Sequence, residues 1–328
     1  MTIDAARDPV GHGRFRTHAT NLDAVRELLA EVRITGRQIG QDQSAFGPLC
    51  GWILTGLGDR YARHEEQIAY VEETLLLMVE GLHRVADGKQ ELKALIRRDG
   101  DVMTIDGTPL IDEPSRSLRG LMDSVTARVQ NRDWVEPQLA GAAPVAEFVA
   151  PVDQMYTALR VGGLHYAMTC IGPLRQLLDD LTGMPDVVAS HATLWHTAGV
   201  DLQQLSVLLR QCLDQDLPRW DRLDVRSYRA LMAHNVEALV GLAETSTAMA
   251  VITKAVGDLI LLTRDIIRGI IGDLFARVIL WTADTSTVIS QAVMTTRLGT
   301  VVATTWRIHA YITALTTSIT TLSRTVDG

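Results

Sequence analysis

Apolar residues recur along most of the chain in alternating steps of three and four, the spacing of one helix face. Thr20, with Asp23 three residues later, has the spacing of a capping box and is expected to begin the first helix. The first run of apolar positions is Leu22, Val25, Leu29, Val32, Gly36 and Ile39. The second run is longer and comprises Leu57, Tyr61, His64, Ile68, Val71, Leu75, Met78, Leu82 and Val85. Two long helices are therefore predicted.

A helix-breaking pair, Gly47-Pro48, separates the two runs, with Phe46 before it and Trp52 after it. We therefore expect residues 20–98 to form one helical hairpin, preceded by a polar tail over residues 1–19.

The composition changes over residues 99–144, where turn signals such as Asp99-Gly100-Asp101 and Asp106-Gly107 follow one another closely. The segments 102–105 and 110–111 are compatible with a small β-hairpin, but a linker between two modules is favoured. A short helix is expected over residues 117–132.

The second module, residues 145–328, is again helical by pattern. Short helices are expected over residues 144–159 and 171–181, and Pro185 has the right position to begin a long helix that ends at Pro218. The apolar positions that line one face of a predicted helix are called its seam. The seam of this helix is Trp195, Ala198, Leu202, Leu205, Leu209 and Cys212. The next seam is Val225, Tyr228, Met232, Asn235, Leu239, Leu242, Ser246, Met249, Thr253, Val256 and Ile260.

Beyond Ile260 the apolar face widens, as in a helix with several neighbours, through Ile266, Ile267, Ile270, Ile271, Leu274 and Phe275. A helix over residues 278–296 and a break at Gly299 are expected to follow. The last seam is Ile308, Ile312, Leu315, Ile319, Leu322 and Val326. The whole pattern predicts an all-α protein whose long antiparallel helical hairpins form an elongated helical bundle.

Composition argues against several classes of ligand and site. The formal net charge of -8 argues against a nucleic-acid ligand, whose phosphates need a basic face. The three cysteines are too scattered for a disulfide framework or a metal knuckle. The first fifteen residues lack the apolar core of a secretory leader, and no run reaches the ~20 uninterrupted apolar residues of a spanning helix; the nearest, residues 308–323, is short and rich in threonine.

Candidate chemistry is sparse. His191 and His196 are five residues apart, which places them on different helix faces. In a zinc-binding helix the two histidine ligands are four residues apart. His64 falls within a seam, where a packed core histidine is the favoured interpretation. No catalytic, cofactor-binding or metal-binding residues are predicted, and the chain is not expected to be an enzyme.

The segment Trp220 to Tyr228 resembles a known motif. Proteins of the Trp-x-Gly (WXG) superfamily of actinobacterial type VII (ESX) secretion carry Trp-x-Gly-x-Ala-Ala-x-x-Tyr between two long antiparallel helices. Trp220 and Tyr228 match in identity and spacing, whereas Arg222 replaces the glycine. Together with Trp195, residues 145–328 resemble the helical trafficking region of long type VII toxins.

Residues 20–97 resemble a second family, the EspC-like secretion-associated proteins, through Ala45-Phe46-Gly47-Pro48-Leu49-Cys50-Gly51-Trp52 and the seam that follows. Secreted WXG partners also carry Tyr-x-x-x-Asp/Glu, and Tyr61 with Glu65 fits this candidate export signal. The alternative for this pair is two residues flanking a helix seam.

The resemblances imply a type VII secretion substrate or secretion-associated helical adaptor that acts through helix–helix pairing. The implied partners are small WXG- or EspC-like hairpin proteins, or the second hairpin of the same chain, and the secretion ATPase. The implied location is cytoplasmic before export by a leaderless route, then secreted or attached to the cell envelope. The alternative function is a membrane-active, pore-forming or membrane-associated protein that uses its C-terminal apolar helices.

Overall fold

The computed structural model describes residues 9–41, 45–46, 53–99, 102–105, 108–109, 121–141, 176, 180–181, 183–216, 223–283 and 291–327. The chain forms two compact units. The first unit combines residues 1–42, 58–126 and 191–251, and the second combines residues 43–57, 127–190 and 252–328. Each unit takes segments from both sides of residues 99–144.

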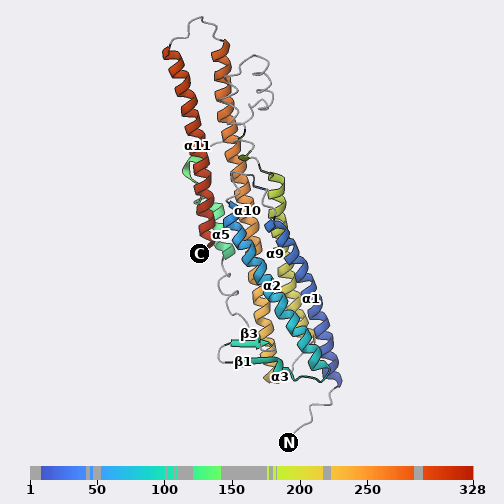
Figure 1. Cartoon of the computed structure of the whole chain (residues 1–328). Coiled ribbons are helices and arrows are strands. Elements are labelled where there is room, and N and C mark those ends of the chain that lie inside the picture. The colour runs from blue at the N-terminus through green and yellow to red at the C-terminus, as the bar shows by residue number, and fades with distance from the viewer. Residues whose placement is uncertain are drawn as a thin grey trace. The chain divides into compact units, whose positions relative to one another are not determined.

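Long helices dominate the described residues, which confirms the predicted all-α helical bundle (Figure 1). Five of them are long: α1 (Pro9–Gln41), α2 (Ile53–Ala86), α9 (Pro185–Asp216), α10 (Leu223–Ala283) and α11 (Gln291–Asp327). Pro185 is the first residue of α9, where its fixed φ suits the first turn and its missing N–H costs nothing.

The predicted seams are the buried faces of these helices. In α10, all eleven predicted seam positions from Val225 to Ile260 are buried. In α2, the seam is buried from Tyr61 to Val85, and in α1 from Leu22 to Ile39. The three-four spacing of the sequence therefore identified the core directly.

Paired contacts give the directions of the helices in the first unit. Arg16, near the start of α1, is 2.8 Å from Asp87, just past the end of α2, so α1 and α2 are antiparallel. In α9 and α10, a Cβ on Gly199 would lie 2.6 Å from Thr247, whereas Asp214 pairs with Arg229. These two helices are antiparallel as well.

The helices of both predicted hairpins share one hydrophobic core in the first unit (Figure 1). Its side chains come from α1 (for example Leu22 and Leu29), α2 (Leu75), α9 (Leu202) and α10 (Leu239), and all five have no exposed surface. Truncation of such a residue to alanine typically costs about 2–5 kcal/mol, so this common core is the main stabilising feature of the unit.

A small antiparallel sheet replaces the linker that was favoured after residue 98. Its strands are β1 (Ile96–Asp99), β2 (Val102–Ile105) and β3 (Thr108–Pro109), in the order β1-β2-β3. The short helix α3 (Leu92–Leu95) leads into β1. The pair Ile96–Ile105 is buried with Leu95, and this burial explains why the segment orders into strands.

The first helix begins earlier than the predicted capping box. The expected tail over residues 1–19 is helical from Pro9, and α1 continues through Thr20. The Thr20 hydroxyl donates to the carbonyl of Arg16, and Asp23 pairs with Arg26, so neither side chain caps a helix. Burial of Phe15, His18 and Ala19 extends the seam upstream and stabilises these extra turns.

The second unit contains α5 residues from Ala127 onward and the short helix α6 (Pro137–Ala140), together with parts of α9 and α10 and the whole of α11. The helix α5 (Leu121–Asn131) ends one residue before the predicted end at 132 and is followed by Arg132 in the left-handed region at φ 55°, whereas residues 117–120 lie outside the described residues. The backbone N–H of Glu136 donates to the buried Ser318 hydroxyl of α11 at 2.9 Å. Trp134 and Leu139 are also buried in this unit.

The break expected at Gly299 is wrong, because α11 runs through it from Gln291. The helix expected over residues 278–296 does not begin at 278, since α10 continues through that position to Ala283, and residues 284–290 lie outside the described residues. A single helical glycine costs only about 1 kcal/mol relative to alanine. Thr295, Thr296 and Thr300 bond back to carbonyls four residues earlier, so their hydroxyls are satisfied within the helix. The expected helices over 144–159 and 171–181 and the stop at Pro218 lie outside the described residues, apart from isolated positions.

Candidate interaction sites

The first predicted bend is described at two residues. Ala45 and Phe46 are buried at 1% and 2% exposure, and the Ala45 carbonyl accepts a 2.7 Å hydrogen bond from the backbone N–H of Met184. This bend is therefore fixed to the start of α9 within the second unit. Gly47, Pro48 and Trp52 lie outside the described residues.

Trp195 is the centre of an aromatic cluster in the first unit. The indole is 1% exposed, stacks on Tyr61 at a centroid distance of 5.0 Å, and meets the edge of His64 at 5.6 Å. A Cβ on Gly36 would lie 3.5 Å from the indole ring, an ordinary van der Waals contact, so α1 passes close to the tryptophan at this position. The cluster joins α1, α2 and α9 in a single layer of the core.

His64 is a core histidine, as its place in the seam predicted. Its Nε2 lies 2.8 Å from the Ser246 hydroxyl of α10, whereas its Nδ1 is buried and has no hydrogen-bond partner among the described residues. Complete burial lowers the pKa of His64 to about 4, so the ring is neutral at pH 7.

Tyr228, the tyrosine of the motif, belongs to a second polar layer. Its hydroxyl lies 2.7 Å from His18 Nε2, and His18 Nδ1 lies 2.8 Å from a carboxylate oxygen of Asp216. The Asn21 amide donates to the same carboxylate oxygen at 2.9 Å. These four residues connect α1, α9 and α10. Trp220, the other motif residue of this bend, lies outside the described residues.

The protonation states in this layer follow from burial. Burial lowers the pKa of His18, although the bond to Asp216 opposes that change, and burial raises the pKa of Tyr228 well above its ordinary value. A neutral imidazole therefore donates from Nδ1 to Asp216 and accepts from the Tyr228 hydroxyl at Nε2.

The order carboxylate, imidazole, hydroxyl is that of a catalytic triad, with tyrosine in place of serine. In this layer, however, His18 and Tyr228 have no exposed surface. The contacts connect α1, α9 and α10.

Sequence reasoning missed His18, Asn21 and Asp216 as members of this layer. The available signal was the spacing, because His18 lies four residues before Leu22 and continues the α1 seam. Assignment of residues 1–19 to a polar tail removed His18 from consideration.

The candidate export signal is part of the folded bundle. Tyr61 is 6% exposed and stacks on Trp195, and the carboxylate of Glu65 forms an ion pair with Arg37 of α1. Two further ion pairs between α1 and α2 join Glu72 to Arg33 at 2.9 Å and to Arg26 at 3.9 Å. Such surface pairs contribute up to about 1 kcal/mol each and favour the observed register of the hairpin.

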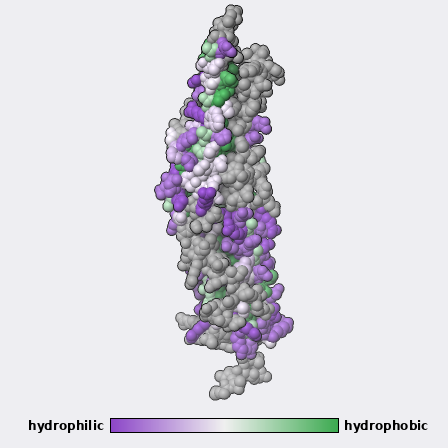
Figure 2. Space-filling model, turned by 60° about the vertical axis from the view of Figure 1, so that its left-hand side comes forward, coloured by the Kyte–Doolittle hydropathy of each residue, from purple (hydrophilic) through white to green (hydrophobic). Residues whose placement is uncertain are grey.

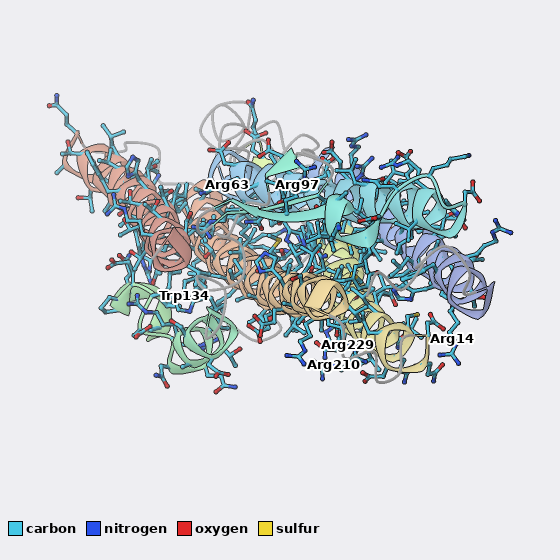
Figure 3. All side chains as sticks on the ribbon, turned by 90° about the horizontal axis from the view of Figure 1, so that it is seen from below. Arg14, Arg63, Arg97, Trp134, Arg210 and Arg229 are labelled. Carbon is cyan, nitrogen blue, oxygen red and sulfur yellow. The ribbon has the colours of Figure 1, made fainter. Side chains whose placement is uncertain are left out.

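Other charged side chains lie on the periphery of the first unit. Of the arginines labelled in Figure 3, Arg14, Arg63, Arg97 and Arg210 are exposed, whereas Arg229 is half-buried. In the described part of the chain, no group of three or more His, Cys, Asp or Glu residues is arranged to hold a metal ion.

No family model, curated protein sequence or solved structure matches this chain. The resemblance to type VII proteins therefore depends on the motif residues of this sequence alone.

Proposed function

We propose that the chain is a type VII (ESX) secretion substrate or secretion-associated helical adaptor that acts through helix–helix pairing, without catalysis. The observation that supports it best is Tyr228, which matches the motif tyrosine and is fully buried at the start of α10, beside the predicted hairpin bend. Trp195, the second tryptophan of the resemblance, is also buried, in the layer that joins the two predicted hairpins.

The two hairpins supply the surface for this pairing. Each one has an apolar stripe that needs another helical surface to cover it. In this chain the stripes of α1 and α2 face those of α9 and α10 in one core, which favours pairing inside the chain over pairing with a separate small hairpin protein. A folded bundle of this kind, cytoplasmic before export, would be presented to the secretion ATPase and leave the cell without a leader.

Export tests this proposal directly. The full chain, tagged at one end, is expressed in an actinobacterial host with an active type VII system and in the same host without its secretion ATPase. The chain should reach the culture filtrate or the cell envelope in the first strain and stay in the cytoplasm in the second, while a cytosolic protein controls for lysis. Equal export from both strains, or none from either, would refute the proposal.

The candidate export signal is tested by a matched pair of variants. Glu65→Ala removes the acidic residue of the signal and one ion pair, whereas Glu66→Ala removes the exposed neighbouring carboxylate. If Tyr61 and Glu65 form an export signal, only the first variant should remain in the cell. Equal export of the two variants would show that Tyr61 and Glu65 are ordinary helix residues and not an export signal.

The second candidate function is a membrane-active protein. Among the described residues, one helical stretch, Val225–Trp281, is long and apolar enough to cross a bilayer, with a mean hydropathy of 1.4 in its most apolar window. Since 56% of that window is buried within the protein, the stretch also has the properties of a core helix. Leakage of vesicle contents at mildly acidic pH tests this function, and absence of leakage at every pH would exclude it.

A further inference from the structure

Two polar layers join the predicted hairpins within the first unit. The His18 layer is defined as His18, Asn21, Asp216 and Tyr228, and the His64 layer as His64 and Ser246. In both layers, side chains of α1 or α2 bond to side chains of α9 or α10. Figure 2 shows many hydrophilic side chains at the surface, where water satisfies them. The two imidazoles and their hydroxyl partners lie inside the core, so they depend on each other.

The two layers have the same separation along two of the helices. On α1, His18 lies in the first layer, and Gly36 lies at the level of the second, beside the aromatic cluster that contains His64. On α10, Tyr228 and Ser246 mark the same two levels. Each separation is 18 residues, or about 27 Å along the helix axis. A shift of one hairpin along the other therefore disrupts both layers at once.

The apolar positions of the seams do not select a register in this way. Several seam positions seven residues apart carry the same residue: Leu22 and Leu29, Val25 and Val32, and, on α9, Leu202 and Leu209. A shift by one heptad therefore exchanges like side chains, and apolar burial alone tolerates more than one register. α2 ends at Ala86 and α9 begins at Pro185, so no short loop fixes the register between the hairpins either.

The polar layers are sensitive to the same shift. Moving the hairpin α9–α10 by one heptad in one direction brings Leu209 into the His18 layer in place of Asp216. Moving it in the other direction brings Leu239 into the His64 layer in place of Ser246. Either shift leaves a buried imidazole nitrogen opposite an aliphatic side chain, and the lost hydrogen bond is not replaced by water in the core.

We propose that the His18 and His64 layers select the register and the partner of the hairpin α1–α2. A surface that pairs with this hairpin has to present a carboxylate and a phenol hydroxyl at one level. It also needs a second hydroxyl 18 residues further along the helix that carries the phenol. A hairpin protein without these groups is rejected, because His18, Asn21 and His64 would be buried without partners.

This inference deepens the proposed function and rests on it, since it assumes that the chain acts through helix pairing and names the residues that choose the pairing. Its test uses the purified chain and measures register. A chain that is not exported could still have the register set by these layers, and an exported chain could have it set by other contacts. The two experiments therefore fail independently.

Distances between spin labels on the full-length chain, measured by double electron–electron resonance, test the proposal. The labels are attached at two exposed positions, Thr20→Cys on α1 and Thr197→Cys on α9, in a parent chain whose three cysteines are replaced by serine. The apolar variant replaces both layers: His18→Leu, Asn21→Leu, Asp216→Leu, Tyr228→Phe, His64→Leu and Ser246→Ala. The parent should give one distance. The apolar variant should give at least one more, about 10 Å from the first, which is the length of one heptad.

Stability separates the choice of register from an ordinary structural role. Replacing buried polar partners together by apolar side chains is neutral or stabilising, so the thermal midpoint of the apolar variant should equal or exceed that of the parent. The single-layer variant, His64→Leu with Ser246→Ala, retains the His18 layer and should keep one distance. Size-exclusion chromatography with light scattering should show a monomeric parent and dimers in the apolar variant, because two copies can then exchange hairpins.

The matched control removes polar groups that do not join the hairpins. Ser206→Ala with Thr245→Val changes two buried hydroxyls that bond to carbonyls of their own helices, and should keep the single distance. A single parental distance in the apolar variant would overturn the proposal, because other contacts, such as Trp195 with Gly36, would then set the register. So would loss of cooperative unfolding in that variant, since the layers would then be required for folding itself, or a second distance in the control.

Discussion

Substitution of His64 by leucine should make the protein less sensitive to acid. The imidazole is 2% exposed, has one hydrogen bond to Ser246, and has no partner at Nδ1 in the part of the chain that the structure describes. Its pKa in the folded state is about 4, compared with 6.5 for an unperturbed histidine. A proton therefore binds the unfolded chain more readily than the folded one.

The sign and size of the effect follow from that difference. Between pH 6.5 and about 4 the unfolded state binds the proton first, so stability is complete above pH 6.5 and is lost as the pH falls. The difference between the two pKa values of His64 corresponds to about 3 kcal/mol in the free energy of unfolding, and about 2 kcal/mol of this is lost by pH 5. The lowered pKa of His18 acts in the same direction and should remain in the variant.

Urea unfolding at pH 7.5 and pH 5.0 measures this effect. The wild-type chain should lose about 2 kcal/mol more between these two pH values than His64→Leu. Ser246→Ala is the matched control, because it removes the hydrogen-bond partner but keeps the imidazole and should therefore keep the dependence on pH. If the free energy of unfolding falls by the same amount between pH 7.5 and pH 5.0 in His64→Leu and in the wild type, His64 is not a neutral residue of the core.

Further substitutions test other contacts of the structure. Tyr228→Phe removes the hydroxyl bonded to His18 and leaves a buried ring nitrogen without a partner, so the free energy of unfolding should fall by about 1–3 kcal/mol; an unchanged value would contradict the hydrogen bond. Gly199→Ala places a Cβ 2.6 Å from Thr247 and 3.0 Å from the Ala243 carbonyl, and should lower the stability by about 1–3 kcal/mol. Gly299→Ala meets no atom within 4 Å and should raise the stability by up to about 1 kcal/mol. Shifts of the same sign in the thermal midpoint for the two glycine variants would refute the described packing.

The sequence predicted the long helices because each has a continuous buried face. The α10 seam, for example, is buried at every predicted position from Val225 to Ile260, including polar Asn235, Ser246 and Thr253. A periodic apolar pattern of this length indicates that one face of the helix is buried, but it does not indicate which element covers that face.

Local signals were less reliable at helix ends and short elements. The Thr20 capping pattern and Gly299 both suggested boundaries. Packing of Phe15 and His18 extends α1 upstream of Thr20, and α11 continues through Gly299, since a single helical glycine costs only about 1 kcal/mol. The strands near residues 96–109 depend on burial of Ile96 and Ile105 in the common core, which a turn-rich sequence does not reveal.

The polar layers could be predicted only in part. His64 and Tyr228 lie in seams and were named from the sequence, whereas their partners Ser246, His18 and Asp216 come from helices distant along the chain. A single sequence does not indicate which polar residues of two seams reach the same level of a bundle. These pairs required the three-dimensional arrangement of the helices.

Light scattering coupled to size-exclusion chromatography tests most directly whether the core of the first unit is formed by helices of one chain. The purified chain should elute as a monomer of about 36 kDa and unfold cooperatively, because α1 and α2 are covered by α9 and α10 of the same molecule. A chain that folds only as a dimer, or only together with a separate hairpin protein, would contradict this arrangement.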